Sequence, residues 1–265
     1  MKPRLIVALV AAMAFTSAVN AEEAVRLYAA GSLKAVMTDI GAAYTKAHGV
    51  AVKGEFGPSG LLRKRLAEGE PADVFASANM AHPQALHKAG KSGPVTMFAR
   101  NRLCALTSPK VEVTTETLLE RMLDPQVKLG MSTPKADPSG DYAMALYDKA
   151  EALEPGAAKA LSDKALRLTG GPDSPPPPKD RVVYGVLVDE GEADIFLTYC
   201  TNALLAQKEV PSLKIVQVPE ALAVGADYGL TVASDRAEAH KFADYILSDK
   251  GQALLKQHGF APPAP

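Results

Sequence analysis

Four short turns combine small or polar residues with the start of a predicted helix, a combination that can hold an anion. The first turn of a helix has about four backbone N–H groups without a partner in the helix, together with a partial positive charge. Small residues there let a ligand approach the backbone closely. Serine, aspartate and proline are also ordinary residues at helix starts, so each turn has a purely structural explanation as well. The turns are Ala30-Gly31-Ser32, Gly57-Pro58-Ser59-Gly60, Asp137-Pro138-Ser139-Gly140 and Lys179-Asp180-Arg181.

Sequence motifs of enzymes are absent or incomplete in this chain. Residues 57–61 lack the second glycine of a G-x-S-x-G nucleophile elbow, and residues 132–135 match S-x-x-K without the S-D-N and K-T-G motifs that accompany it. The five histidines form no metal spacing such as H-E-x-x-H, and no nucleotide-binding glycine motif occurs. We therefore expect a protein that is not an enzyme and has no cofactor. The enzymatic alternative, an exported hydrolase with Ser32 or Ser59 as nucleophile, lacks a credible His–Asp partner set.

Predicted strands and helices alternate along the chain, and two of the turns fall where the first strands end. Strands are predicted over residues 24–29, 50–56 and 72–76, with helices over 32–48 and 61–68 between them. This βαβαβ order indicates an α/β fold with a parallel sheet covered by helices. Open sheets of this kind bind ligands at the carboxyl ends of their strands. Further strands are predicted over 102–107, 128–131, 194–199, 214–218 and 228–232, and further helices over 141–152, 181–189, 237–246 and 250–258.

The loop before the fourth turn contains four consecutive prolines, Pro175 to Pro178. Proline lacks a backbone N–H group and has a fixed φ angle, so this run can be neither a helix nor a central strand. We expect a stiff, extended surface connection.

The first 21 residues have the pattern of a secretory signal peptide. Lys2 and Arg4 precede an apolar stretch over residues 5–15, and Val19-Asn20-Ala21 is a small-residue cleavage site. Removing these 21 residues from the 265 leaves 244, in which no apolar run is long enough to span a membrane. We therefore expect a periplasmic protein without a membrane span in its mature chain.

The net charge and the number of cysteines exclude several classes of protein. The formal net charge of -1 argues against a nucleic-acid partner, which would require a basic surface. Two cysteines are too few for a disulfide-dense scaffold or a four-cysteine zinc site. In an oxidising compartment, Cys104 and Cys200 could form one disulfide, and the alternative is two buried thiols.

Several of these segments resemble the ModA family, the periplasmic molybdate-binding proteins of ABC transporters. Residues 29–33 are similar to the family's first ligand loop and residues 56–60 to its second, while residues 71–78 match its P-A-D-V-F-A-S-A run. Residues 101–103 are similar to the crossing into the family's second lobe, and residues 243–253 with Gly259-Phe260 to its closing helices. The resemblance covers essentially the whole chain after the signal peptide.

The resemblance implies a two-lobed periplasmic binding protein of type II, which closes on its ligand like a Venus flytrap. Each lobe would be a mainly parallel sheet flanked by helices, with residues 22–101 and 213–265 in lobe I and residues 102–212 in lobe II. The chain would act as a monomer that captures molybdate or tungstate and delivers it to the membrane permease and ATPase subunits of an ABC importer. Molybdenum would be bound only as this oxyanion.

Five residues fall on the family's ligand positions. The resemblance implies that Ser32, Ser59 and Tyr199 donate through their hydroxyls, and that Ser32, Ser59, Ser139 and Arg181 donate through backbone N–H groups. Arg181 stands where the family has an apolar residue, so the alternative is another oxyanion or a small carboxylate that the Arg181 side chain helps to bind. A ring of donors without an acceptor would also reject a protonated oxyanion such as hydrogen phosphate. Its O–H group would be left without a partner, at a cost of about 1–3 kcal/mol.

Overall fold

The computed structural model describes residues 23–263, so the signal peptide predicted over residues 1–21 lies outside the described residues. Within that range the predicted βαβαβ start is confirmed. The five elements are β1 (Val25–Ala30), α1 (Lys34–His48), β2 (Val52–Gly57), α2 (Ser59–Ala67) and β3 (Val74–Ser77). β1 pairs in parallel with both β2 and β3. A 3-10 turn over Gly31–Leu33 joins β1 to α1, and Gly49 ends α1 with a φ of 75°, which is the left-handed conformation that favours glycine.

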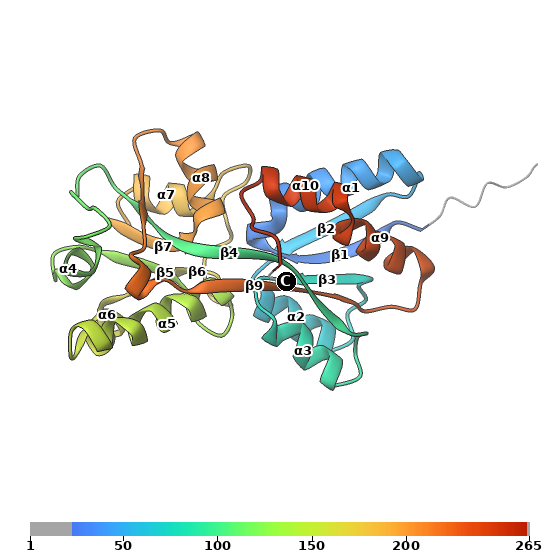
Figure 1. The fold of residues 1–265 in the computed structure, drawn as a ribbon, viewed down its shortest axis with the longest axis horizontal. Coiled ribbons are helices and arrows are strands. Elements are labelled where there is room, and N and C mark those ends of the chain that lie inside the picture. The colour runs from blue at the N-terminus through green and yellow to red at the C-terminus, as the bar shows by residue number, and fades with distance from the viewer. Residues whose placement is uncertain (1–22, 264–265) are drawn as a thin grey trace, which may run out of the picture.

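Two long strands join the two ends of the molecule. β4 (Val95–Thr107) and β9 (Gly225–Val232) pair in antiparallel orientation, and Figure 1 shows them running through the centre between two groups of helices. The strand order is β2-β1-β3-β9-β4-β7-β5-β6, and β8 also pairs with β4. We call the end that holds β1, β2 and β3 side A, and the end that holds β5 to β8 side B.

Side B is built around β5 (Leu129–Ser132), which lies parallel to β6 (Leu166–Thr169) and β7 (Ile195–Tyr199). The second part of β4 is antiparallel to β7 and to β8 (Lys214–Gln217). The sequence grouped β8 with lobe I, whereas its pairing with residues 104–107 of β4 attaches it to side B.

Helices cover both faces of the sheet on each side. On side A, α1, α9 (Ala237–Leu247) and α10 (Asp249–Gln257) lie on one face, opposite α2 and α3 (Ala81–Lys88) (Figure 1). On side B, α7 (Val183–Asp189) and α8 (Cys200–Glu209) lie opposite α5 (Pro138–Leu153) and α6 (Ala157–Lys164), with α4 (Leu118–Leu123) near the outer end. A second 3-10 turn spans Glu220–Leu222. Across residues 23–263, no helix has both the length and the apolar character needed to cross a bilayer.

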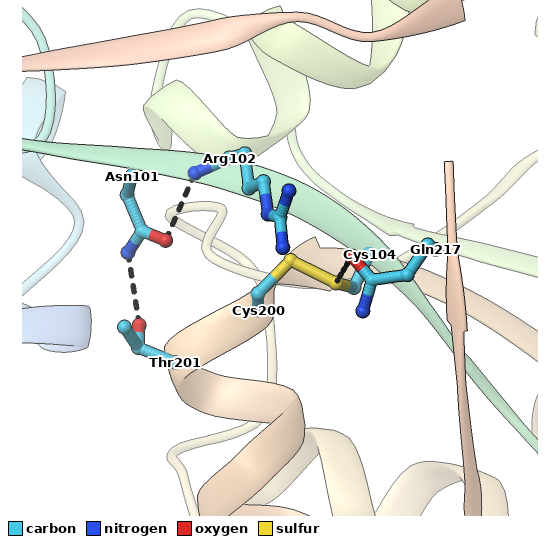
Figure 2. The surroundings of a disulfide bond; sticks show 6 residues. All are labelled: Asn101, Arg102, Cys104, Cys200, Thr201 and Gln217. Carbon is cyan, nitrogen blue, oxygen red and sulfur yellow. Dashed lines mark hydrogen bonds between the residues drawn. A yellow bond between two sulfur atoms is a disulfide. The ribbon is translucent and has the colours of Figure 1, made fainter. Parts of the chain in front are cut away.

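A disulfide fixes the end of β7 to the central strand β4. Cys104 lies in β4 and Cys200 is the first residue of α8, and their Cα atoms are 4.9 Å apart (Figure 2). Because Cys200 directly follows Tyr199, this bond also holds Tyr199 in place. β7 itself is buried at every residue, as expected for a strand covered by helices on both faces.

Candidate ligand-binding cleft

A cavity of about 1210 Å³ is lined by residues from both sides of the molecule, and we call it the cleft. Side A contributes the turns after β1 and β2, including Ser32 and Ser59. Side B contributes Tyr199 at the end of β7, Asp137 before α5, and most of the loop between β6 and α7. Turns that are far apart in the sequence therefore meet in one place, at the carboxyl ends of their strands.

Ser32 is oriented by a chain of hydrogen bonds that runs through the centre of the molecule. Its Oγ lies 2.9 Å from the hydroxyl of Tyr228 on β9. Asn101 Nδ2 donates to that hydroxyl at 3.4 Å and to Thr201 Oγ1 at 2.9 Å (Figure 2 shows the second bond). Because Tyr228 accepts from Asn101, its own proton can go to Ser32, which leaves the Ser32 proton free to donate into the cleft. Burial raises the pKa of Tyr228, so its hydroxyl keeps that proton at neutral pH.

The sequence did not identify Tyr228, Asn101 or Thr201 as site residues. Ser32 and Tyr228 are 196 positions apart, and their contact depends on the antiparallel insertion of β9 beside β3. A buried tyrosine in a predicted strand gives no sign of this role, because most such tyrosines are ordinary core residues.

Ser59 and Tyr199 approach the cleft from opposite sides and share a neighbour, Ala78. Ser59 is fully buried at the first position of α2, and its Oγ accepts from the Ala78 N–H at 3.1 Å. Its own proton is therefore available for a ligand. The Tyr199 hydroxyl donates to the Ala78 carbonyl at 3.5 Å, the outer limit of a hydrogen bond, so exchange for a charged acceptor would cost little. Burial raises the pKa of Tyr199 well above its ordinary value, which keeps this donor protonated.

Ser139 is the expected ligand residue that the structure does not bring to the cleft wall. It is fully buried in α5, and its N–H, which we expected to bind the anion, donates to Asp137 Oδ1 at 3.0 Å. Its Oγ has no hydrogen-bond partner among residues 23–263. The physical reason is helix capping. Asp137 is the N-cap of α5, and its side chain accepts from the Ser139 N–H, which would otherwise be available to an anion.

Asp137 instead places an acceptor in a cleft for which the sequence predicted only donors. Burial raises the pKa of Asp137 to about 6, against the opposing effects of the Ser139 N–H and the Ser132 hydroxyl. Within the described part of the chain, no lysine, arginine or histidine forms an ion pair with it. The sequence did contain a signal, the Asp-Pro pair at a helix start, but this signal is equally typical of a helix cap that faces no ligand.

Arg181 lies at the rim of the cleft and faces a carboxylate. Its side chain is 44% exposed, and its Nε lies 3.8 Å from Glu209 Oε2. Helix α7 begins at Val183, two residues later than predicted, and both carboxylate oxygens of Glu209 accept from the Val182 N–H at 3.0–3.1 Å. Arg181 and Glu209 both line the cleft, so the rim presents a loose ion pair to a ligand.

The four prolines form part of the cleft wall. Residues 175–178 have no regular secondary structure, as predicted, and they line the cavity together with Gly170, Gly171 and Ser174. A segment that the sequence described only as a surface connection therefore also borders the candidate site.

The two sides touch directly through their backbones beside the cleft. The N–H of Gly60, in the first turn of α2, donates to the carbonyl of Ala136 at 2.9 Å. A Cβ atom at residue 60 would lie 2.7 Å from that oxygen, closer than real Cβ atoms come, so only glycine allows this approach.

Comparisons with known proteins agree with this architecture. An uncharacterized protein of Pasteurella multocida is 37% identical over 239 residues, which cover 89% of this chain and 98% of that protein. The molybdate-binding protein ModA of Mycobacterium tuberculosis is 30% identical over 251 residues, which cover 89% of this chain and 84% of that protein. Among solved structures, the periplasmic molybdate-binding protein of Azotobacter vinelandii superimposes with a TM-score of 0.72 at 18% identity, covering 91% of this chain and all of that one.

The fold, with a cleft lined from both of its sides, is that of a periplasmic binding protein. The match to a protein family is equally extensive, since it spans residues 25–261. This chain belongs to the bacterial extracellular solute-binding protein family. Members of this family bind small solutes and are in general not enzymes.

Proposed function

We propose that this chain captures a small tetrahedral oxyanion, with molybdate or tungstate as the first candidates, and delivers it to the permease and ATPase subunits of an ABC importer. The observation that carries the proposal is the convergence of the Ser32, Ser59 and Tyr199 hydroxyls on one cleft from both sides of the molecule. The 30% identity to a molybdate-binding protein supports the choice of anion. The signal-peptide pattern supports a periplasmic location, and we propose that the chain acts as a monomer.

Neutral donors can hold a dianion if enough of them converge on it. Each hydrogen bond to a charged partner contributes about 1.5–3 kcal/mol, and each helix N-terminus adds about 0.3–1 kcal/mol. Three hydroxyls and the first turn of α2 give a gross attraction that must still exceed the hydration lost by the anion. Ser139 does not add its N–H to this set, and Arg181 would add its own only if the rim closes further.

We also propose that sides A and B are the two lobes, with β4 and β9 as the crossing strands. A ligand that touches Ser32 and Ser59 on one lobe and Tyr199 on the other would bind the closed form better than the open form and shift the population toward it. The closed form would then be the shape that the permease recognises.

Calorimetric titration with molybdate, tungstate, sulfate and phosphate tests the proposal. We expect molybdate or tungstate to bind the mature chain and to raise its melting temperature. If none of the four anions binds, the proposed ligand class is wrong. A double variant, Ser32→Ala with Ser59→Ala, should fold normally and lose binding, because it removes two donors while leaving the apolar core unchanged.

A larger organic anion is the second candidate, and the size of the cleft favours it. A tetrahedral oxyanion occupies only a small part of 1210 Å³, a volume above that of most small-molecule sites. Arg181 would then release Glu209 and pair with a carboxylate of the ligand. Arg181→Ala separates the two candidates, because a loss of molybdate affinity below about threefold indicates that the side chain does not take part, whereas a larger loss implicates the guanidinium.

A further inference from the structure

Asp137 is a carboxylic acid in the cleft to which Ser32, Ser59 and Tyr199 bring their hydroxyl groups, and Asp39, Glu55, Asp180 and Glu209 also line this cleft. It lies between the N-terminus of α5 and the loop that starts at Gly170, where an added Cβ would lie 2.7 Å from Asp137 Oδ2. One carboxylate oxygen is engaged by the Ser139 N–H at 3.0 Å. Asp137 nevertheless lines the cleft together with Ser59 and Tyr199, and it is near enough to Tyr199 for its charge to act on that hydroxyl, so a ligand bound by Tyr199 would also meet this charge.

The groups packed around Asp137 give no positive charge to neutralise it. From α7 and β7 it faces Tyr184 and Tyr199, which burial keeps protonated. From its own helix it faces Asp141, a second carboxylate whose charge raises the pKa of Asp137 further. Burial raises the pKa of Asp141 as well, against the backbone hydrogen bond and the positive charge of Lys135, which lies in the preceding turn. An ionised Asp137 would therefore repel any anion that enters the cleft.

A single proton, carried by either Asp137 or the anion, removes the repulsion between them. A protonated carboxyl donates a short, strong hydrogen bond to an anionic oxygen, and an ionised carboxylate can accept the same bond from a protonated oxyanion. We infer that Asp137 and the captured anion share one proton, so that Asp137 is a specificity-determining residue and capture of a fully deprotonated anion takes up a proton from solution. The inference rests on the proposed function, and it replaces the donor-only site that the sequence predicted.

The direction of the pH dependence follows from the pKa of about 6 in the unliganded chain. Above this pH, Asp137 must be protonated before it can bind a dianion, so the affinity should fall about tenfold for each pH unit, and about one proton should be taken up per anion bound. Below it, Asp137 already carries the proton, so the affinity should level off. Hydrogen phosphate brings its own proton and should bind without uptake from the buffer.

Titration calorimetry between about pH 5.5 and pH 8.5, in buffers that differ in ionisation enthalpy, measures both the affinity and the proton uptake. Molybdate and sulfate are suitable probes because they stay deprotonated throughout this range, so any uptake is by the protein. For wild type we expect uptake of about one proton per molybdate at pH 7.5 and a Kd about tenfold higher at pH 8 than at pH 7. The phosphate arm reports whether the shared proton can come from the ligand.

Asp137→Asn is the decisive variant, because the amide caps a helix as well as aspartate does and donates a hydrogen bond at every pH. It should bind molybdate with a Kd that no longer depends on pH. Asp137→Ser is a second variant that keeps a capping oxygen, and it should also lose the pH dependence. Asp148→Asn, at an exposed position of the same helix, makes the same change in charge and should keep the wild-type slope. His258 also lines the cleft, bonded to Asp39 at 2.7 Å, and it is unchanged in all three variants.

Three outcomes would contradict the inference in different ways. If molybdate binds wild type with the same affinity at pH 6 and pH 8 and without proton uptake, Asp137 does not share a proton, and the proposed function still stands. If no anion of the set binds wild type or either Asp137 variant at any pH, the proposed function fails and the inference fails with it. If pH dependence persists in Asp137→Asn, a group other than Asp137 takes up the proton and the inference is wrong.

Discussion

The backbone contact between the two sides can be tested by giving Gly60 a side chain. Gly60 donates to Ala136 at 2.9 Å, and a Cβ atom at residue 60 would lie 2.7 Å from the same oxygen. The same Cβ atom would lie even closer to the carbonyl oxygen of Lys135. Carbon and oxygen atoms in proteins normally stay at least about 3.3 Å apart, so Gly60→Ala would push the two sides apart by more than about 0.6 Å. Such a shift would strain or break the Gly60–Ala136 hydrogen bond and move Ser59 away from Tyr199.

The loss of affinity expected for Gly60→Ala can be estimated from the steric cost of the added Cβ atom and the cost of the lost hydrogen bond. Steric crowding of a well-packed contact costs about 1–3 kcal/mol, and the lost hydrogen bond costs about 0.5–1.5 kcal/mol. The closed form should therefore lose about 2–4 kcal/mol, which corresponds to a Kd about 30- to 1000-fold higher for whichever anion binds the wild type. We expect the two sides to separate in the open form, which would remove this contact, so the melting temperature without ligand should change little.

Calorimetric titration and thermal melting of the same preparations provide the assay. Gly225→Ala is the matched control, because an added Cβ at that position meets no atom within 4 Å. If Gly60→Ala binds the anion within about threefold of wild type, the Gly60–Ala136 contact does not contribute to capture. If Gly60→Ala lowers the melting temperature of the free chain by more than about 5 °C, the contact stabilises the fold itself and the assignment to closure is wrong.

Three further predictions concern single features of the structure. The Cys104–Cys200 disulfide links residues 96 positions apart, so the double Cys→Ser variant should lose about 4–5 kcal/mol of unfolding free energy in guanidinium titration, and an unchanged midpoint would contradict this. Tyr228→Phe should raise the Kd for the anion about 3- to 10-fold, because Ser32 is no longer oriented, whereas Ser32→Ala should raise it about 10- to 150-fold. If Tyr228→Phe has an effect equal to or larger than that of Ser32→Ala, the role of Tyr228 is not indirect. For Asp73, burial alone would raise the pKa, but hydrogen bonds from Arg26, Ser234 and Arg236 lower it overall. Its stabilising effect should therefore be complete above about pH 4 and be lost below that pH, and Asp73→Asn should flatten the acid branch of the stability curve.

The sequence predicted those parts of the molecule that local pattern determines. The βαβαβ start, the two glycine- and serine-containing turns and the strand that ends at Tyr199 all have strong local signals, and they were found near their observed places. α3 was missed because it is only 8 residues long and contains Pro83, which interrupts the helical periodicity. α8 was missed because it begins at Cys200, directly after β7, without a turn residue between them.

The candidate site was predicted less completely, because its chemistry depends on distant contacts. Ser32 and Ser59 could be identified from their turns, but Tyr228 reaches Ser32 only through the packing of β9, and Asp137 reaches the cleft only through the placement of α5. Ser139, by contrast, was expected at the site and does not line the cleft. Its turn has the composition of an anion site, yet the N–H of interest is taken by the aspartate two residues earlier, and only the observed side-chain orientation of Asp137 reveals this.

The proline segment gives the cleft a wall of nearly constant dimensions. Pro175 to Pro178 have their φ angles fixed by their rings, so this wall has few alternative shapes in the empty protein and loses little entropy when a ligand packs against it. For the same reason it cannot fold inward around a ligand that is too small. We therefore expect this segment to limit the size of the anions that can bind, whereas the hydroxyls and Asp137 would respond to the charge and protonation of the anion.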